Sequence, residues 1–314
     1  MTYFLLFLIS FLISLAVVWL ARFFGGKFQF FDLPKEDPQK IKIHQKPISF
    51  LGGLAMFLVF LILFLAVSHF GGFLDWKSGA ILSSAFLIFS VGFFDDLKWK
   101  NYSVKPKIKL SFLILFSFLA ALILESAGIK IQFLESIIAG FILTFFYILA
   151  LINVIDFQDG IDGLAGGMTT ISLLGFIVIF LSGGNLLPFL ISLILLGAVL
   201  GFLIFNFPPA SIFMGDSGAY FLGFFLAVLA ILFSKPCNIL SIIGPILIIG
   251  LPIFDTAYVI VKRVLEKKSP IVGDRDHFYD VLHFKKGFSV KKTLLICYFI
   301  QVILVAGGLF FIYI

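Results

Sequence analysis

Ten continuous apolar segments dominate this sequence of 314 residues. A helix needs roughly 20 apolar residues to cross a bilayer core about 30 Å thick, and each segment meets or approaches that length. The segments lie near residues 2–22, 50–70, 79–94, 108–125, 133–152, 163–182, 186–205, 218–234, 239–262 and 293–313. Because their apolar residues are continuous and do not alternate with polar ones, they favour helices over barrel strands. We therefore predict an all-α integral membrane protein with about ten transmembrane helices.

The amino-acid composition indicates that little of the protein lies outside the membrane. The chain is 61% hydrophobic and 13% charged, whereas soluble domains are about 45–50% apolar and about 25% charged. The first segment has no basic residues before it and no small-residue cleavage site after it, so we expect a retained span and not a signal peptide. No internal repeat is visible, and the isolated Cys237 and Cys297 suggest neither a metal site nor a disulfide. We expect one polytopic domain over residues 1–314.

The basic residues predict the orientation. The loops after the first, third and ninth segments hold 20 of the 23 lysines and arginines. Such loops stay in the cytoplasm, so both termini are expected on the outer side. We expect the protein in the cell (inner or plasma) membrane. The net charge of +6 then reflects topology, and no basic helix or aromatic platform suggests a nucleic-acid partner.

The acidic residues gather on the same predicted side. Of the 17 acids, 14 lie there or at its membrane boundary. Carboxylates at a bilayer edge are costly and usually mark a functional site. Asp95 and Asp96 are adjacent, and neighbouring carboxylates repel unless a cation or a shared proton relieves them. We therefore predict an active site on the cytoplasmic face.

The segment "NVIDFQDGIDGLAGG" carries three of these acids. Asp156, Asp159 and Asp162 lie three residues apart, so they could share one broad face of a helix. The surrounding glycines permit a ligand to approach the backbone closely. One acid and one glycine would suffice for a plain polar turn, so this segment favours a site.

Two further segments complete the pattern. In "NFPPASIFMGDSGAYFLG", prolines end one helix, and Asp216 either caps the next helix or binds a metal ion. In "KSPIVGDRDHFYDVLHFKKG", Arg275 and His277 could grip a phosphate, although this segment alone is typical of a solvated basic loop. Together the clusters suit a hard cation such as Mg²⁺, which binds carboxylates and substrate phosphates, beside a lipid co-substrate.

These motifs resemble those of the polyprenyl-phosphate N-acetylhexosamine-1-phosphate transferases over nearly the whole chain. Shared features are the early "H-x-x-P…GG", the acidic pair, the "DGxDGLA" segment, "FMGDxG" and "DRxH". The resemblance implies a transferase that moves N-acetylhexosamine-1-phosphate from a UDP-sugar to polyprenyl phosphate and releases UMP. It also implies Mg²⁺, with Mn²⁺ as a substitute, and a role in starting cell-wall, lipopolysaccharide or teichoic-acid synthesis. A homodimer is compatible with it.

The resemblance also assigns roles position by position. The catalytic set is Asp95, Asp96 and Lys109, with Lys107 as the match in a shifted register. The metal ligands are Asp216 and Asp156. The nucleotide-sugar contacts are Asp159, Asp162, Asn206, Phe213, Arg275 and His277, and His44 is a further candidate.

Two departures from the family pattern bear on the donor. Asp156 stands where many relatives have Asn, which adds a charge near the metal. The "DRDHFYD" segment lacks the additional histidines of many bacterial members, including the three-histidine run of the muramoyl-pentapeptide branch. We therefore predict transfer of GlcNAc-1-phosphate to undecaprenyl phosphate.

The sequence leaves two alternative functions open and argues against a third. Phospho-MurNAc-pentapeptide transfer remains open within the same family. A membrane transporter that uses the acids for a coupling ion remains open as a different class, although transporters often show repeated halves and midplane charges. CDP-alcohol phosphatidyltransferases need an Arg soon after the first "DG", and "DGIDGLAGGMTT" has none.

Overall fold

A computed structural model describes residues 2–28, 30–32, 47–99, 106–268 and 275–314. Its long helices are α1 (Thr2–Phe28), α2 (Gly52–Phe70), α3 (Trp76–Phe94), α4 (Pro106–Ser126), α5 (Ile137–Gln158), α6 (Leu164–Ser182), α7 (Leu186–Asn206), α8 (Gly215–Phe233), α9 (Leu240–Ile249), α10 (Leu251–Leu265) and α12 (Val290–Tyr313). The short elements are strands β1 (Phe31–Asp32) and β2 (Ile48–Ser49), helix α11 (Phe278–Asp280), and the π-helical turns η1 (Asp95–Trp99) and η2 (Val281–Lys285).

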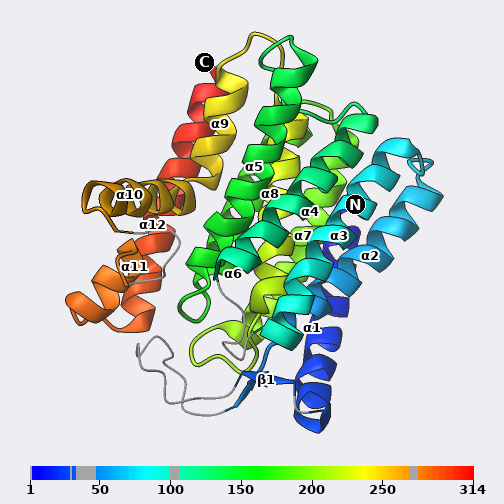
Figure 1. Cartoon of the computed structure of the whole chain (residues 1–314). Coiled ribbons are helices and arrows are strands. Elements are labelled where there is room, and N and C mark those ends of the chain that lie inside the picture. The colour runs from blue at the N-terminus through cyan, green and yellow to red at the C-terminus, as the bar shows by residue number, and fades with distance from the viewer. Residues whose placement is uncertain (1, 29, 33–46, 100–105, 269–274) are drawn as a thin grey trace.

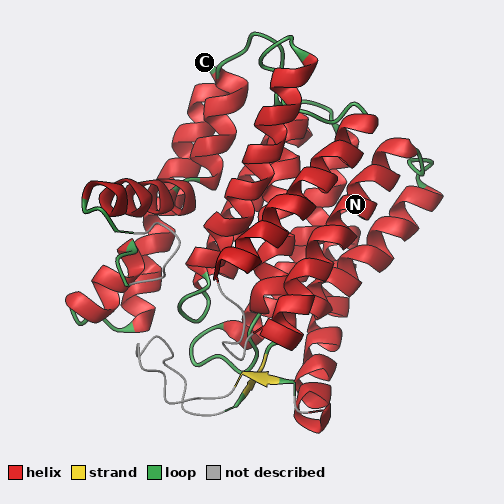
Figure 2. Ribbon diagram, in the orientation of Figure 1, coloured by secondary structure: helices red, strands yellow, loops and turns green. Residues whose placement is uncertain are grey.

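The prediction of a helical multi-pass membrane protein is confirmed. Within the described ranges, nine helices are long and apolar enough to cross a membrane, and the bent pair α9–α10 makes up to ten. Most of them run side by side in one bundle (Figures 1 and 2). Within the described residues, the structure adds to the predicted class the antiparallel pairing of β1 with β2, two residues each, at the lower end of the bundle in Figure 1.

Helix α8 forms the centre of the bundle. Sixteen of its 19 residues are buried, and α2, α3 and α5 pack around it. Phenylalanines fill the contacts: the ring of Phe57 on α2 stacks on Phe89 of α3 at 4.2 Å and meets Phe221 of α8 edge-on at 5.7 Å. Such aromatic pairs add to the dispersion energy of packing, which holds helices together where lipid is as apolar as the side chains. The start of α8 is thereby fixed relative to three other helices.

Small polar side chains join α1 to α7. The hydroxyls of Ser10 and Ser14 each donate a hydrogen bond of 2.6 Å, to the carbonyls of Ile194 and Ala198 respectively. Small residues let helix backbones approach closely, and inter-helical hydrogen bonds then add to the packing. This contact anchors α1 although much of its surface faces away from the bundle.

The ninth apolar segment is broken, which corrects the expectation of one continuous span over residues 239–262. Helices α9 and α10 meet at 89°, and Gly250 between them has φ 60° and ψ −116°. Gln301 of α12 receives the polar groups that the break exposes: its side chain accepts from Leu251 N–H at 2.8 Å and donates to the carbonyls of Ile248 and Ile249. Irregular backbone at membrane depth persists where protein satisfies it.

We expect Gln301→Leu to destabilise the protein. The substitution leaves the Leu251 N–H and neighbouring carbonyls buried without this partner, a loss of about 1–3 kcal/mol. Thermal denaturation in detergent measures it, with Gln132→Leu as the control because that side chain is exposed. Equal melting temperatures for the two variants would contradict the role given to Gln301.

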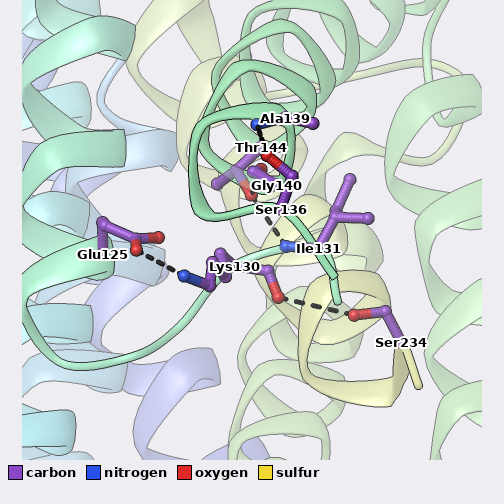
Figure 3. A network of polar contacts seen from close by, with 8 residues as sticks. All are labelled: Glu125, Lys130, Ile131, Ser136, Ala139, Gly140, Thr144 and Ser234. Carbon is purple, nitrogen blue, oxygen red and sulfur yellow. Dashed lines mark hydrogen bonds and ion pairs between the residues drawn. The ribbon is translucent and has the colours of Figure 1, made fainter. Parts of the chain in front are cut away.

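The end of the bundle opposite to β1 and β2 is closed by a loop between α4 and α5 (Figure 3). Lys130 forms an ion pair of 2.7 Å with Glu125, while the N–H of Ile131 donates to the hydroxyl of Thr144 at 2.8 Å. Ser234, at the end of α8, lies 3.5 Å from the carbonyl of Lys130. These contacts tie the loop to α5 and α8, so the polar groups at this end have a structural explanation.

Candidate functional site

Three helix ends meet at the lower end of the bundle in Figure 1. Helix α3 passes into the π-helical turn η1 at Asp95 and Asp96, whose side chains are buried. Helix α5 carries Asp156 in its last turn, and α8 carries Asp216 in its first turn. π-Helical turns within helices are frequent at functional sites. Four of the predicted acids are therefore brought together.

Asp96 caps α8 from a different helix. Its two carboxylate oxygens accept hydrogen bonds from the backbone N–H groups of Asp216 at 2.9 Å and Ser217 at 3.0 Å. The first N–H groups of a helix lack partners within it, and a negative charge is favoured there. Met214, at the N-cap position, supplies no side-chain cap. The sequence left open whether Asp216 caps α8 or binds a metal ion. In the structure, the cap of α8 is provided by Asp96.

Asp95 lies in an ion-paired group with Lys109 and Asp216. The Lys109 Nζ atom lies 2.5 Å from Asp95 Oδ1 and 3.9 Å from Asp216 Oδ2. Asp156 is within electrostatic range of both carboxylates and of Lys109. Lys107, the alternative match in the sequence, is exposed, so Lys109 is the lysine of this group. Three carboxylates facing one ammonium group leave an excess of negative charge that a bound cation would relieve.

A glycine allows α3 and α8 to approach this closely. A Cβ atom on Gly92 would lie 2.6 Å from the Cα of Ser217, closer than real contacts allow. The absence of a side chain therefore places η1 against the first turn of α8.

We expect Gly92→Ala to lower turnover by roughly 100-fold, because a shift of about 1 Å in catalytic groups can have an effect of that size. Gly79→Ala is the matched control, since nothing lies within 4 Å of a Cβ at this position of the same helix. Steady-state kinetics of both variants test the claim. Unchanged turnover in Gly92→Ala would mean that the close approach is unimportant.

The segment after α5 corrects the expectation of a shared helical face. Helix α5 ends at Gln158, so Asp156 lies on it while Asp159 and Asp162 lie in the following turn. Gly163 then adopts φ 80°, a left-handed conformation that favours glycine and starts α6 in a new direction. The three acids therefore do not form one stripe, because α5 ends at Gln158, between Asp156 and Asp159.

Asp162 and Asn206 connect this turn to the loop before α8. Asp162 accepts a hydrogen bond from the N–H of Ala210 at 2.9 Å. The buried side chain of Asn206 accepts from Gly163 N–H at 3.0 Å and donates to the carbonyl of Ile212 at 2.9 Å. Phe213 donates its backbone N–H to the Ser49 carbonyl at 2.7 Å. These residues shape the loops that surround the acidic group.

Arg275 and Asp276, which lie just before α11, contact different partners. The Arg275 guanidinium lies over the ring of Phe284 at 3.7 Å. Asp276 pairs with Lys285 at 2.8 Å and Lys262 at 2.9 Å, and hydrogen bonds from these two ammonium groups hold the pKa of Asp276 well below its usual range. These contacts join the loop to α10 and η2.

His277 forms a hydrogen bond with Asp255, a residue that the site prediction missed. Its Nδ1 lies 2.9 Å from Oδ2 of Asp255, a buried carboxylate on α10. The signal was available in the sequence: Asp255 is an acid inside an apolar segment, and such residues are usually functional. Among the predicted residues, His44 lies outside the described ranges.

Sequence comparisons identify the family of this chain. A family model described as "Glycosyl transferase family 4" matches residues 78–234, which contain Asp95, Asp156 and Asp216. A probable undecaprenyl-phosphate N-acetylglucosaminyl 1-phosphate transferase of Bacillus subtilis (strain 168) is 36% identical over 275 residues, covering 84% of this chain and 74% of that protein. The chain belongs to glycosyl transferase family 4.

Other relatives within the family differ in their sugars. A decaprenyl-phosphate N-acetylglucosaminephosphotransferase of Mycolicibacterium smegmatis is 29% identical, covering 83% of this chain and 71% of that protein. A phospho-N-acetylmuramoyl-pentapeptide-transferase of Dictyoglomus turgidum is 35% identical, covering 79% and 80%. Overall identity therefore separates the two branches poorly.

The donor atoms of this family 4 site fit a hard metal ion. Asp95, Asp156 and Asp216 offer carboxylate oxygens, the ligands that Mg²⁺ prefers. Within the described part of the chain, no three His, Cys, Asp or Glu side chains are grouped closely enough to hold a metal by themselves. Mg²⁺ commonly binds through one or two carboxylates and takes its other ligands from substrate phosphates and water. The arrangement therefore suits a metal ion that binds together with a diphosphate.

Proposed function

We propose that this family 4 enzyme transfers N-acetylhexosamine-1-phosphate, preferably GlcNAc-1-phosphate, from a UDP-sugar to undecaprenyl or another polyprenyl phosphate. The observation that carries the proposal is the group of Asp95, Lys109 and Asp216 at one end of the helix bundle. Its concentrated charge suits phosphoryl chemistry, and the surrounding apolar helices suit a lipid acceptor. The product would start the synthesis of a cell-envelope glycan.

The proposed reaction is a substitution at phosphorus: one P–O bond forms, one P–O bond breaks, and no oxidant or further reactant is needed. An oxygen of the lipid phosphate forms a bond to the β-phosphorus of the donor. The bond from that phosphorus to the bridging oxygen breaks, and UMP leaves with the oxygen. The products are a lipid-diphosphate sugar and UMP.

The residues of the acidic group receive separate roles in this proposal. Asp95 and Lys109, which form an ion pair of 2.5 Å, orient the lipid phosphate in this proposal. Asp156 and Asp216 hold Mg²⁺, or Mn²⁺ in its place, and the ion when bound neutralises charge on the phosphates. Phosphoryl transfer depends mainly on such positioning and electrostatic stabilisation.

The remaining predicted residues form the donor side of the proposed site. Asp159 and Phe213 lie in the two loops beside the acidic group, and Arg275 and His277 supply cationic or hydrogen-bonding groups for the diphosphate. Asp162 and Asn206 hold the loops through backbone contacts, so their part in nucleotide binding is to shape the pocket.

The segment from Arg275 to His283 supports a small N-acetyl sugar. It reads "DRDHFYDVLH" with its preceding Asp and has no consecutive histidines. The Bacillus and Mycolicibacterium relatives carry N-acetylglucosamine in their names, whereas the similarly distant Dictyoglomus relative is a muramoyl-pentapeptide transferase. Transfer of phospho-MurNAc-pentapeptide is the alternative.

The proposed active site faces the cytoplasm, with both termini outside. The acidic group lies at the end of the bundle where α3, α5 and α7 end, and the basic residues cluster in loops after the first, third and ninth segments. Retention of basic loops in the cytoplasm favours this orientation. It gives a cytoplasmic UDP-sugar direct access. A transporter, the alternative from another class, would need a coupled ion and release no UMP.

A donor panel tests the proposal. Purified protein in detergent receives undecaprenyl phosphate, Mg²⁺ and either UDP-GlcNAc, UDP-GalNAc or UDP-MurNAc-pentapeptide, and UMP release gives kcat/KM for each donor. We expect UDP-GlcNAc to be preferred. Preference for the muramoyl donor would overturn the sugar assignment, and release of UMP from no donor would overturn the function.

A further inference from the structure

A buried hydrogen-bonded group lies beside the acidic site, and its central residue, on α10, has no role in the reaction described so far. At its centre is Asp255, whose side chain is 2% exposed. Asp255 Oδ1 accepts from the backbone N–H of Phe278 at 2.7 Å, and Oδ2 accepts from Gln158 Nε2 at 2.8 Å and lies 2.9 Å from His277 Nδ1. His277 and Phe278 are neighbours, whereas Gln158 belongs to a segment far away in the sequence.

The position of Gln158 connects this group to the acidic site. Gln158 is the last residue of α5 and follows Asp156 by two positions, whereas His277 and Phe278 begin the segment that contains α11. Asp255 therefore holds the end of α5 and the His277 loop in one fixed arrangement. The break at Gly250 turns α10 by 89° from α9, so that α10 lies beside the bundle and at a steep angle to it (Figure 1).

The geometry also determines which nitrogen of His277 carries the proton. A carboxylate only accepts hydrogen bonds, so Nδ1 must donate. Nε2 makes no hydrogen bond to any residue in the described ranges, so it is the ring nitrogen without a protein partner there. The ring is held further by stacking on Tyr279 at 5.8 Å and by contact with Phe157 at 5.6 Å.

We propose that Asp255 is a positioning residue of the donor site, which orients His277 with its proton on Nδ1 and leaves Nε2 for the donor diphosphate. This inference rests on the proposed function. The protonated ring then donates both N–H groups, one to Asp255 and one to a phosphate oxygen, and the carboxylate balances the charge of the imidazolium. A carboxylate that fixes the tautomer and orientation of a histidine acts in this way in other enzymes.

The variant Asp255→Asn separates positioning from simple structural support. The amide offers one oxygen and one NH₂ where the carboxylate offered two acceptors. The Phe278 backbone N–H can only donate, so it takes the oxygen, and the NH₂ then faces His277 and Gln158, whose own amide can turn to present its oxygen. His277 can meet that donor only by moving its proton from Nδ1 to Nε2. The tautomer therefore changes while the fold is kept.

The first experiment reads the tautomer directly. Full-length protein labelled with ¹⁵N-histidine is studied by NMR in detergent, and the His277 signals are assigned by their loss in His277→Ala. We expect Nδ1 to be protonated in the wild type and Nε2 in Asp255→Asn. A wild-type Nδ1 without a proton would overturn the positioning, and this measurement does not depend on activity.

The second experiment is a double-mutant cycle in kcat/KM for UDP-GlcNAc. We expect Asp255→Asn to lower it by roughly 10- to 100-fold, the range for partners that orient a histidine, and the double variant with His277→Ala to be no worse than His277→Ala alone. Thr256→Val is the matched control, because Thr256 is the buried neighbour on α10 and its hydroxyl has no hydrogen-bond partner in the described structure.

The outcomes distinguish the two proposals. Additive losses in the cycle, or an equal loss in Thr256→Val, would show that Asp255 supports only the fold and would overturn the positioning. A wild-type enzyme that releases UMP from no donor would overturn the proposed function. A non-additive cycle together with the tautomer change supports both.

Discussion

Asp216→Asn is expected to lower kcat by about 100- to 1,000-fold, the effect of losing one preorganised electrostatic group. Asp216 lies in the first turn of α8, 3.9 Å from Lys109, at a place where carboxylates exceed cations. Asn keeps the size of the side chain but loses the charge that would hold Mg²⁺. Initial rates of UMP release over a Mg²⁺ titration measure the effect.

Ser217→Ala provides the control for this substitution. Ser217 is the next residue in the same helical turn, and its buried hydroxyl has no hydrogen-bond partner within the described ranges. We expect near-normal turnover and an unchanged melting temperature. If Asp216→Asn kept near-normal activity at limiting Mg²⁺, the assignment of Asp216 as a metal ligand would be wrong.

The second large effect is expected at Asp95, and it should differ in kind from that at Asp96. Asp95 faces Lys109, so Asp95→Asn should lower kcat by about 100-fold or more, the range for a residue that orients or activates a reacting group, with little change in donor KM. Asp96 accepts two backbone N–H groups of α8, so Asp96→Asn should also lower stability, by about 1–2 kcal/mol.

Parallel kinetics and thermal denaturation of the two variants test this division. The sequence treats the two acids as one pair, whereas the structure gives them different partners. Equal losses of stability in both variants would refute the separate roles. A large rise in donor KM for Asp95→Asn at unchanged kcat would move Asp95 to the donor pocket.

The helices were predictable from the sequence because a bilayer imposes a length and a composition on each of them. The predicted segments agree with the structure to within a few residues at most ends. The break at Gly250 was not predictable, because an apolar segment reads the same whether it is straight or bent. It depends on Gln301, which lies 51 positions further along the chain than Gly250 and receives the exposed backbone groups.

The candidate site was predictable to the level of its members but not of their partners. Asp95, Asp156 and Asp216 stand out as acids at the ends of apolar segments, and the structure brings them together. The sequence could not show that Asp96 caps α8 or that Asn206 links two loops, since both contacts join distant segments. Asp255 was visible as an acid in an apolar segment. Its contact with His277 was not, because His277 lies 22 residues further along the chain, after α10 has ended.

The transfer of a phosphorylated sugar is the central claim, and the fate of the donor's β-phosphate tests it most directly. Purified protein is incubated with undecaprenyl phosphate, Mg²⁺ and UDP-GlcNAc carrying ³²P at the β-position, and the lipid is then extracted. The proposed reaction moves the label into the lipid fraction and releases an equal amount of unlabelled UMP. Label that stays in water as UDP would mean that only the sugar is transferred, which would contradict the proposed chemistry.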